Sequence, residues 1–325
     1  MSLTALSCPQ CGAPLPRQAA WRMVACPYCN TKVTRSRAVV ERATFREARA
    51  RLEAAAGAAC EDGARLLRCR GLRYRLLALL GAGEQTDVYL AERIGPLPER
   101  VTLKLARQPG QTGLLAAEAA ILAALQNSTA NGAAYFTQRL PQVVTCGTTE
   151  GIPGQERELL LLRHPAGYWG SLADALHHTP SGIDPRHAVW IWRRVLEVLA
   201  FVHESGWTHG DLALDHWLVH PRDHGVLLIG WRQARPVADA AAIARDLMQS
   251  AWSVRALLTG DADLPVPNSR VPPPLADLLR RCSEDAGFCT QLGARGIEQE
   301  LTGAARAAFG PPRFIPFNPT TVSYH

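Results

Sequence analysis

The sequence predicts an α+β protein in which a small cysteine-containing module is followed by a β-rich lobe and then by a helical lobe. Three observations predict this order. Two CxxC pairs lie near the start, alternating apolar residues with Gly- and Pro-containing turns begin at Leu72, and a helical pattern dominates beyond Leu172. With 325 residues, 47% of them hydrophobic, the chain can form more than one core and is too apolar to be mostly disordered.

The first module carries four of the nine cysteines, in two CxxC pairs. Paired CxxC spacing is typical of a metal site, whereas an odd number of cysteines fits poorly with a set of disulfides. Four thiolates complete a tetrahedral shell, so we expect a zinc ribbon whose ion is structural. The expected ligands are Cys8, Cys11, Cys26 and Cys29. The other five cysteines have no mutual spacing pattern and are assigned no role.

Positive charge is concentrated in the N-terminal quarter of the chain. Residues 1–75 carry 14 basic and 5 acidic side chains, a net charge of +9, against +6 for the whole chain. Basic side chains near the cysteines suit phosphates, which makes nucleic-acid binding through the ribbon one alternative. A solvated basic face is the other, and the sequence favours it because only Trp21 and Tyr28 are aromatic there.

Further along, the pattern alternates between helical and extended segments. Ala, Leu, Arg and Glu at helical spacing from Val39 to Ala56 predict a connecting helix. Five strands are expected in RYRLLALLGAG, TDVYLAER, RVTLKLAR, QVVTCGTT and ERELLLLR, with a helix from Leu114 to Leu125. The predicted domains are a zinc ribbon over 1–37, a helical linker over 38–71, a β-rich lobe over 72–165, a helical lobe over 166–310 and an extended tail over 311–325.

A set of motifs runs through the two lobes. The segment from Gly81 to Val88 is glycine-rich and lies between two predicted strands, Lys104 lies on a third strand, and Glu118 lies on the next helix. The segment His209-Gly-Asp-Leu-Ala-Leu-Asp-His-Trp-Leu-Val219 follows. In this order the motifs resemble the protein kinase family over residues 72–310. The resemblance implies a two-lobed protein kinase-like fold, with a small β-rich N-lobe and a helical C-lobe, preceded by the zinc ribbon.

The resemblance also implies roles for individual residues. In the family the glycine-rich loop covers ATP phosphates, the strand lysine contacts phosphate and pairs with the helix glutamate, and the loop aspartate accepts the substrate proton. These roles fall on Gly81, Gly83, Val88, Lys104, Glu118 and Asp211. Asp246 is expected to brace the backbone of the catalytic loop. A structural ion pair between Lys104 and Glu118, without phosphate contact, is an equal alternative.

The departures from the family pattern lie at the metal ligands. His216 replaces the metal-binding Asn, and Gly230-Trp-Arg replaces the DFG triplet, so both expected Mg²⁺ ligands are absent. The loop tip carries Glu84 and Asp87, whose charges would oppose phosphates. Positions 230 and 246 are 16 apart, too few for an activation loop with a peptide platform. We therefore expect weak or absent binding of Mg·ATP.

Together these features predict a pseudokinase. By analogy, it would act as a scaffold or allosteric regulator in a bacterial signalling complex, with protein partners that include phospho-signalling components. An atypical ATP-dependent phosphotransferase that uses an ion such as Mn²⁺ is an alternative, because Lys104, Glu118 and Asp211 are retained. The start of the sequence has no secretory signal and no apolar run could cross a bilayer, so we expect a cytoplasmic protein with no membrane partner.

Overall fold

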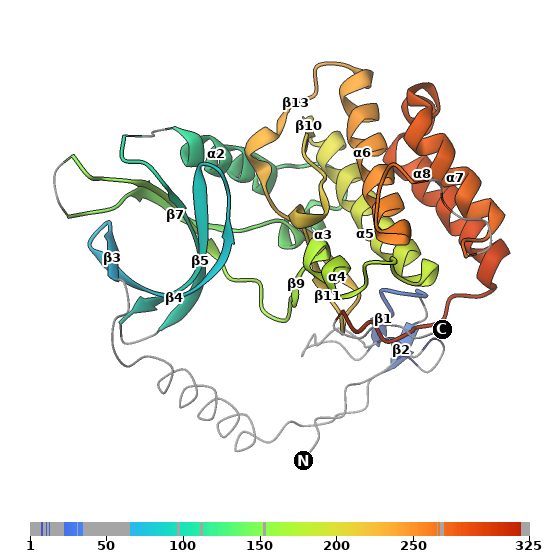
Figure 1. The fold of residues 1–325 in the computed structure, drawn as a ribbon, viewed down its shortest axis with the longest axis horizontal. Coiled ribbons are helices and arrows are strands. Elements are labelled where there is room, and N and C mark those ends of the chain that lie inside the picture. The colour runs from blue at the N-terminus through green and yellow to red at the C-terminus, as the bar shows by residue number, and fades with distance from the viewer. Residues whose placement is uncertain are drawn as a thin grey trace, which may run out of the picture. The chain divides into compact units, whose positions relative to one another are not determined.

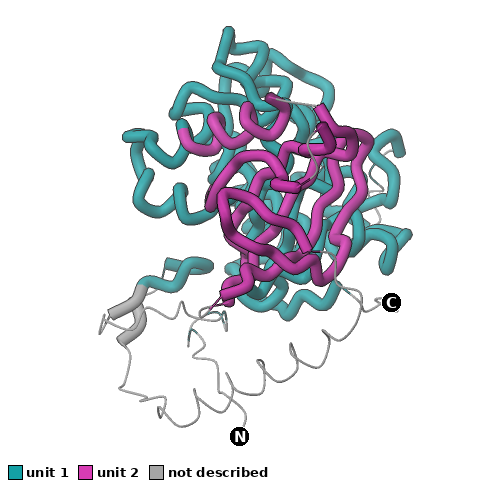
Figure 2. Tube along the Cα trace, turned by 90° about the vertical axis from the view of Figure 1, so that its left-hand side faces the viewer, with its two compact units in different colours: residues 1–33, 124–141, 166–325 teal, residues 34–123, 142–165 magenta. Residues whose placement is uncertain are grey.

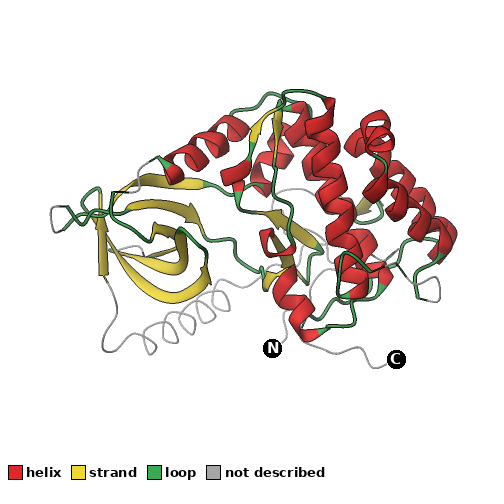
Figure 3. Ribbon diagram, turned by 45° about the horizontal axis from the view of Figure 1, so that its top comes forward, coloured by secondary structure: helices red, strands yellow, loops and turns green. Residues whose placement is uncertain are grey.

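The computed structural model describes residues 8, 11, 13, 23–30, 32–34, 66–95, 98–110, 113–151, 154–264, 266 and 270–319. The chain divides into two compact units (Figure 2). We call residues 34–123 and 142–165 the sheet unit, and residues 1–33, 124–141 and 166–325 the helical unit. The long strands belong to the sheet unit and most of the helices belong to the helical unit (strands yellow and helices red in Figure 3). The helix expected from Val39 to Ala56 lies outside the described residues.

The sheet unit contains a six-stranded antiparallel sheet in the order β3-β4-β5-β6-β8-β7 (Figure 1). All five expected strands form, and so does the expected helix, α2. The elements are β3 Leu66–Cys69, β4 Leu72–Ala82, β5 Thr86–Ile94, β6 Glu99–Ala106, α2 Leu114–Gln126, β7 Val143–Thr148 and β8 Glu158–Arg163. The last residues of α2 belong to the helical unit.

Strand β3 was not expected, because the linker was predicted to reach residue 71. Instead β3 pairs with β4 through a two-residue turn at Arg70 and Gly71. Both turn residues have positive φ, at 49° and 73°, which is the geometry that joins tightly twisted strands. Arginine rarely adopts positive φ, so the dipeptide Arg70-Gly71 does not predict a hairpin turn as Asn-Gly would.

The core of the sheet unit comes from alternating positions on neighbouring strands. Tyr74, Leu103, Leu105, Leu159 and Leu161 are buried in one cluster. Burial of apolar side chains on one face of each strand fixes the register of the sheet, because a slip by one residue would expose the whole set. That register places the glycine-rich hairpin, Lys104 and the start of α2 relative to one another.

The helical unit is built from long helices with short strands between them. Its elements are α3 Ala133–Phe136, β9 Gly170–Ser171, α4 Leu172–His178, α5 Pro185–Glu204, β10 Trp207–Thr208, β11 Trp217–His220, β12 Gly225–Leu228, β13 Arg235–Pro236, α6 Ala240–Thr259, α7 Pro273–Glu284 and α8 Ala286–Phe309. The two-stranded β1 Met23–Ala25 and β2 Lys32–Thr34 belong to the cysteine-containing module.

Helix α5 lies at the centre of this unit and is buried nearly all round. Trp190 and Trp192 are both buried although they lie on different faces, as their spacing predicts. Helix α8 is interrupted at Gly293, whose φ of 60° and ψ of −177° are not helical. After α8, residues 310–319 belong to no helix or strand. Among the described helices, none has the length and apolar character needed to cross a membrane.

Candidate functional site

Lys104 and Glu118 form an ion pair in the sheet unit. Lys104 lies on β6 opposite Val88 of β5, and its Nζ lies 2.5 Å from Oε2 of Glu118 on α2. The Glu118 side chain is only 2% exposed. A carboxylate at that depth requires a cationic partner, because desolvation of an unpaired charge is costly. The pair therefore holds α2 against the sheet, whatever else it does.

A second carboxylate, Glu158 at the start of β8, fixes the beginning of α2. It accepts hydrogen bonds from the backbone N–H groups of Gly113, Leu115 and Ala116, at 3.2, 2.9 and 2.8 Å. These donors have no partner within the helix, and a negative charge also complements the helix dipole. Glu158 was not among the residues singled out from the sequence. Its sequence signal is an acidic side chain at the edge of an apolar strand.

The glycine-rich segment forms a tight hairpin. Gly81 lies at the end of β4 and Gly83 lies in the turn that leads to β5. Glu84, at the tip, is exposed. Asp87, which was expected to oppose phosphates, lies on β5, and its Oδ1 accepts a hydrogen bond from Nε of Arg107 at 2.8 Å. Its charge is therefore neutralised by a neighbour within the sheet unit.

In the helical unit, Asp246 braces the loop that begins at His209, as the sequence predicted; the family resemblance makes this segment the counterpart of the catalytic loop. Its two carboxylate oxygens accept hydrogen bonds from the backbone N–H groups of His209 and Gly210, at 2.7 and 2.8 Å. The imidazole Nε2 of His203 lies 3.0 Å from the same carboxylate. Asp246 is 1% exposed, so these contacts replace all of its hydration.

The same face of α6 makes two more contacts with the loop. Gln249 accepts a hydrogen bond from the backbone N–H of Leu212 at 3.4 Å, and the Ser253 hydroxyl donates to the Leu212 carbonyl at 2.6 Å. Gln249 and Ser253, three and seven positions after Asp246, lie on the same side of α6 as Asp246. The loop is thus held along its length by one helix face, which the sequence analysis did not identify beyond Asp246.

His209 is a packed core residue. It is fully buried, its Nε2 lies 3.1 Å from the carbonyl oxygen of Ile229, and its ring contacts the edge of Trp231 at 4.5 Å between centroids. Burial lowers the pKa of His209 to about 4. The imidazole is therefore neutral near pH 7, and it ties the catalytic loop to the segment that precedes Gly230.

Asp211, His216 and Gly230 lie together. His216 Nδ1 is 3.0 Å from the carbonyl oxygen of Asp211 and 3.5 Å from its Oδ1. Gly230 has a φ of 79°, and a Cβ added there would lie 2.6 Å from the Nε2 and Cδ2 atoms of His216. The imidazole therefore occupies the space that any side chain at position 230 would need.

The chain after Gly230 packs directly onto the catalytic loop. Gly210 has a φ of 80°, and a Cβ there would lie 2.7 Å from the carbonyl oxygen of Gln233. Strand β13 then pairs with β10, and α6 begins at Ala240. The close approach of the Gln233 backbone explains why position 210 is glycine.

Comparison with solved structures identifies the architecture. One match is described as "Crystal structure of BubR1 kinase domain", at 12% sequence identity and a TM-score of 0.55, and it covers 76% of this chain and 84% of that chain. The chain has a protein kinase-like fold. This similarity concerns the fold alone. No family model matches the chain. A search of the curated proteins gives no match either.

Beside the kinase-like fold, the four N-terminal cysteines form one cluster. The Sγ atoms of Cys8 and Cys29 are 3.7 Å apart, those of Cys11 and Cys26 are 3.6 Å apart, and all four lie within 4.8 Å of one another. Four sulfurs at about 2.3 Å from one ion are about 3.8 Å apart, so the cluster fits tetrahedral Zn²⁺. Asn30, just after the second pair, has a φ of 60°.

Proposed function

We propose that this chain is a catalytically inactive kinase-like protein that acts as a scaffold or allosteric regulator. One observation carries the proposal: the His216 ring lies where a side chain at position 230 would have to be, 2.6 Å from the expected Cβ. In the family, a carboxylate at this position holds Mg²⁺ across the phosphates. The two substitutions support each other, because glycine at 230 makes room for the imidazole.

The short segment after Gly230 supports the same proposal. A protein kinase positions a peptide hydroxyl in line with the γ-phosphate, and positioning is most of the catalysis of phosphoryl transfer. Here the backbone at Gln233 is packed against Gly210, and β13 is paired with β10. The few residues between Gly230 and the start of α6 are also too short a segment for a peptide platform.

An atypical phosphotransferase remains the second candidate. It is favoured by the intact Lys104–Glu118 pair and by Asp211, whose side chain is 39% exposed and thus open to a substrate. His216 could ligate a softer ion such as Mn²⁺ through Nε2. ATP turnover that depends on Mn²⁺ and is lost in Asp211→Ala would establish this candidate and overturn the first.

We expect Mg·ATP to leave the melting temperature unchanged at micromolar concentrations. The ligand at position 230 is absent, so the phosphates would bring charge into the site without a bound ion to neutralise it. A ligand at ten times its dissociation constant stabilises the native state by about 1.4 kcal/mol. A thermal-shift titration with Mg·ATP, and with ATP plus EDTA as the control, measures this. A rise that requires Mg²⁺ would contradict the proposal.

We further propose that the cysteine cluster binds one structural Zn²⁺. The four sulfurs complete the shell, so this ion would stabilise the module and do no chemistry. Burial raises the pKa of the Cys11 and Cys26 thiols. A cation is therefore needed to hold these groups as thiolates at neutral pH.

We expect purified protein to contain one zinc per chain. Elemental analysis measures this content. The double variant Cys8→Ser with Cys29→Ser should lose the metal, because two ligands cannot hold it. The matched control is Cys282→Ser with Cys289→Ser, which changes two buried cysteines in the helical unit and should keep the zinc. Metal-free wild-type protein, or a Cys8/Cys29 variant with full zinc content, would refute the zinc assignment.

A protein without catalysis acts through binding, so we infer protein partners, for which phospho-signalling components are the candidates by analogy. Nucleic-acid binding is less well supported. Tyr28, one of the two aromatic residues near the cysteines, is packed beside His224 and Phe314. The other, Trp21, lies outside the described residues. Affinity purification from the native host, with and without nuclease, separates the two classes of partner.

A further inference from the structure

The extended segment after α8 is held on the helical unit by two aromatic side chains. Phe314 and Phe317, three residues apart, both enter a cluster of rings. Phe317 is 8% exposed, although the backbone around it belongs to no helix or strand. An apolar side chain buried from an extended segment requires a prepared groove, because its own backbone supplies no core.

The groove has an aromatic floor. The imidazole of His224 is stacked between Trp190, at 4.2 Å and 7°, and Phe314, at 4.3 Å and 28°. Phe317 contacts the ring of His187 on α5 at 4.8 Å. Burial lowers the pKa of His224 to about 3 and that of His187 to about 4. Both imidazoles are thus uncharged near neutral pH and pack as apolar rings.

The same segment is bound to the cysteine module. The Phe314 N–H donates to the carbonyl oxygen of Cys11 at 2.7 Å, and the Tyr28 hydroxyl donates to the carbonyl oxygen of Arg313 at 3.0 Å. Figure 1 shows this C-terminal segment running beside β1 and β2. Cys11 is one of the four clustered residues, and Tyr28 lies between the other pair, Cys26 and Cys29. The segment is therefore attached to both cysteine pairs.

The cysteine module is also anchored to α5. Arg194, which is 6% exposed, donates from its guanidinium to the carbonyl oxygen of Pro27 at 2.8 Å. Its charge is balanced by Glu197 one turn later, at 2.8 Å. The module and the C-terminal segment thus share one face of α5, and each covers part of the other.

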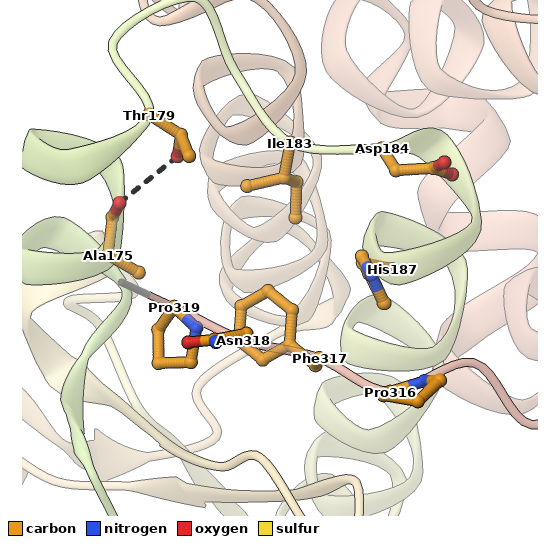
Figure 4. Close-up of a pocket in the computed structure, with 9 residues that line it drawn as sticks. All are labelled: Ala175, Thr179, Ile183, Asp184, His187, Pro316, Phe317, Asn318 and Pro319. Carbon is orange, nitrogen blue, oxygen red and sulfur yellow. Dashed lines mark hydrogen bonds between the residues drawn. The ribbon is translucent and has the colours of Figure 1, made fainter. Parts of the chain in front are cut away.

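The C-terminal segment does not fill the groove completely. A cavity of about 90 Å³ remains beside Phe317 and Asn318, and Figure 4 shows Thr179, Ile183 and His187 around it. The segment leaves this space to solvent. A ligand that leaves such space can be displaced by one that fills it, because unfilled volume forfeits contacts.

We propose that this groove is a peptide-binding site for an extended segment with two aromatic side chains three residues apart. The chain's own C-terminal segment occupies it in cis, and zinc at the neighbouring cysteines holds that segment in place. The proposal rests on the zinc site proposed above. Because the segment bonds directly to the backbone of the cysteine module, metal binding and segment docking stabilise each other, and this linkage is reciprocal.

The first test measures zinc transfer from the full chain to a chromogenic chelator, after one zinc per chain has been verified. Phe314→Ala with Phe317→Ala should speed the transfer by about fivefold or more, although no ligand is changed. Phe309→Ala is the matched control, because this phenylalanine at the end of α8 is exposed and should have no effect. Unchanged transfer in the double variant overturns the linkage but leaves the zinc site standing, whereas absent zinc removes the zinc site itself.

A milder variant guards against misfolding of the double variant. Tyr28→Phe removes only the hydroxyl that donates to Arg313, and it should still speed zinc transfer by about fivefold. Trypsin provides a second measurement, since it cleaves after Arg313. Cleavage there should be slow in zinc-loaded protein and fast after the zinc is chelated. Equal cleavage rates in the two states contradict the proposal.

The second test supplies the segment in trans. A labelled peptide of residues 311–319 should bind the Phe314/Phe317 variant and should bind zinc-loaded wild-type protein much more weakly, because the cis segment competes at an effective concentration of about millimolar. The same peptide with both phenylalanines changed to alanine is the control and should not bind. Failure of the intact peptide to bind the open variant, or equal binding of both peptides, overturns the peptide site.

Discussion

Replacing Asp246 by alanine is expected to lower the free energy of unfolding of the helical unit by about 3–5 kcal/mol. Asp246 accepts hydrogen bonds from the N–H groups of His209 and Gly210 and contacts Nε2 of His203. Both N–H groups lose their acceptor in the variant, and a buried donor left without an acceptor costs about 1–3 kcal/mol. The loss reaches this size because water cannot replace a carboxylate that is 1% exposed.

Urea unfolding followed by tryptophan fluorescence measures the effect, since Trp192, Trp217 and Trp231 are buried in this unit. Asp239→Ala is the matched control. Asp239 caps the start of the same helix by accepting a hydrogen bond from Ala242, and its loss should cost about 0.5–2 kcal/mol. If the two variants are equally stable, Asp246 does not hold the catalytic loop and the architecture of the site is misassigned.

Much of the fold could be predicted from the sequence, because the local strand and helix patterns agreed with the order of the motifs along the chain. Alternating apolar residues placed all five expected strands, and the spacing of Lys104, Glu118 and Asp246 along the resembling motifs placed their contacts. For these residues the side-chain type alone nearly determines the contact that the residue makes. A lysine on a buried strand and a glutamate on the next helix have few other ways to satisfy their charges.

The features that escaped prediction depend on contacts between distant positions. In the sequence, glycine at 230 and histidine at 216 read as two separate losses of a metal ligand. In the structure the two are linked, because the His216 ring fills the space that a side chain at position 230 would need. Glycine at 210 likewise is explained only by the approach of the Gln233 backbone. Such pairs leave no periodicity in the sequence, so a pattern of residue types cannot reveal them.

The C-terminal segment illustrates the same limit. It was predicted to be extended, but nothing in its sequence indicated that Phe314 and Phe317 would be buried against His224 and His187. An extended segment has no amphipathic face of its own, and its partners come from α5 and from the turn between β11 and β12. The two phenylalanines are therefore buried because of the residues that form the groove, and the sequence of the segment itself does not reveal it.

The contact between His216 and position 230 leads to the second large effect. Gly230→Asp should be destabilising by about 2–3 kcal/mol, because its Cβ would meet the His216 ring at 2.6 Å and overpacking of a fixed site costs this much. Gly206→Asp is the matched control, since Gly206 has a φ of 81° with open space around it. It measures the cost of positive φ alone, which Asp tolerates better than most residues.

Adding His216→Asn to Gly230→Asp should recover most of the stability lost through the clash. The smaller amide leaves the space that the imidazole filled, so the two changes should be non-additive by about 1–2 kcal/mol. The same double variant should gain Mg²⁺-dependent nucleotide binding, measured by thermal shift, because both expected ligand types are then present. Additive destabilisation would show that the two positions do not compete for one space.

Even with both ligands restored, we expect the double variant to show no protein phosphorylation. Positions 230 and 246 are only 16 apart, and the residues between them include β13, the start of α6 and Gln233, whose backbone packs on Gly210. A substrate hydroxyl therefore has no surface that would hold it in line near Asp211, and such orientation is worth about 7–11 kcal/mol of the barrier. Radiolabelled ATP assays on general protein substrates and on a co-purified partner decide the matter. Phosphorylation well above that of a variant that also carries Asp211→Ala would mean that the fold had lost only its metal ligands and could still position a substrate.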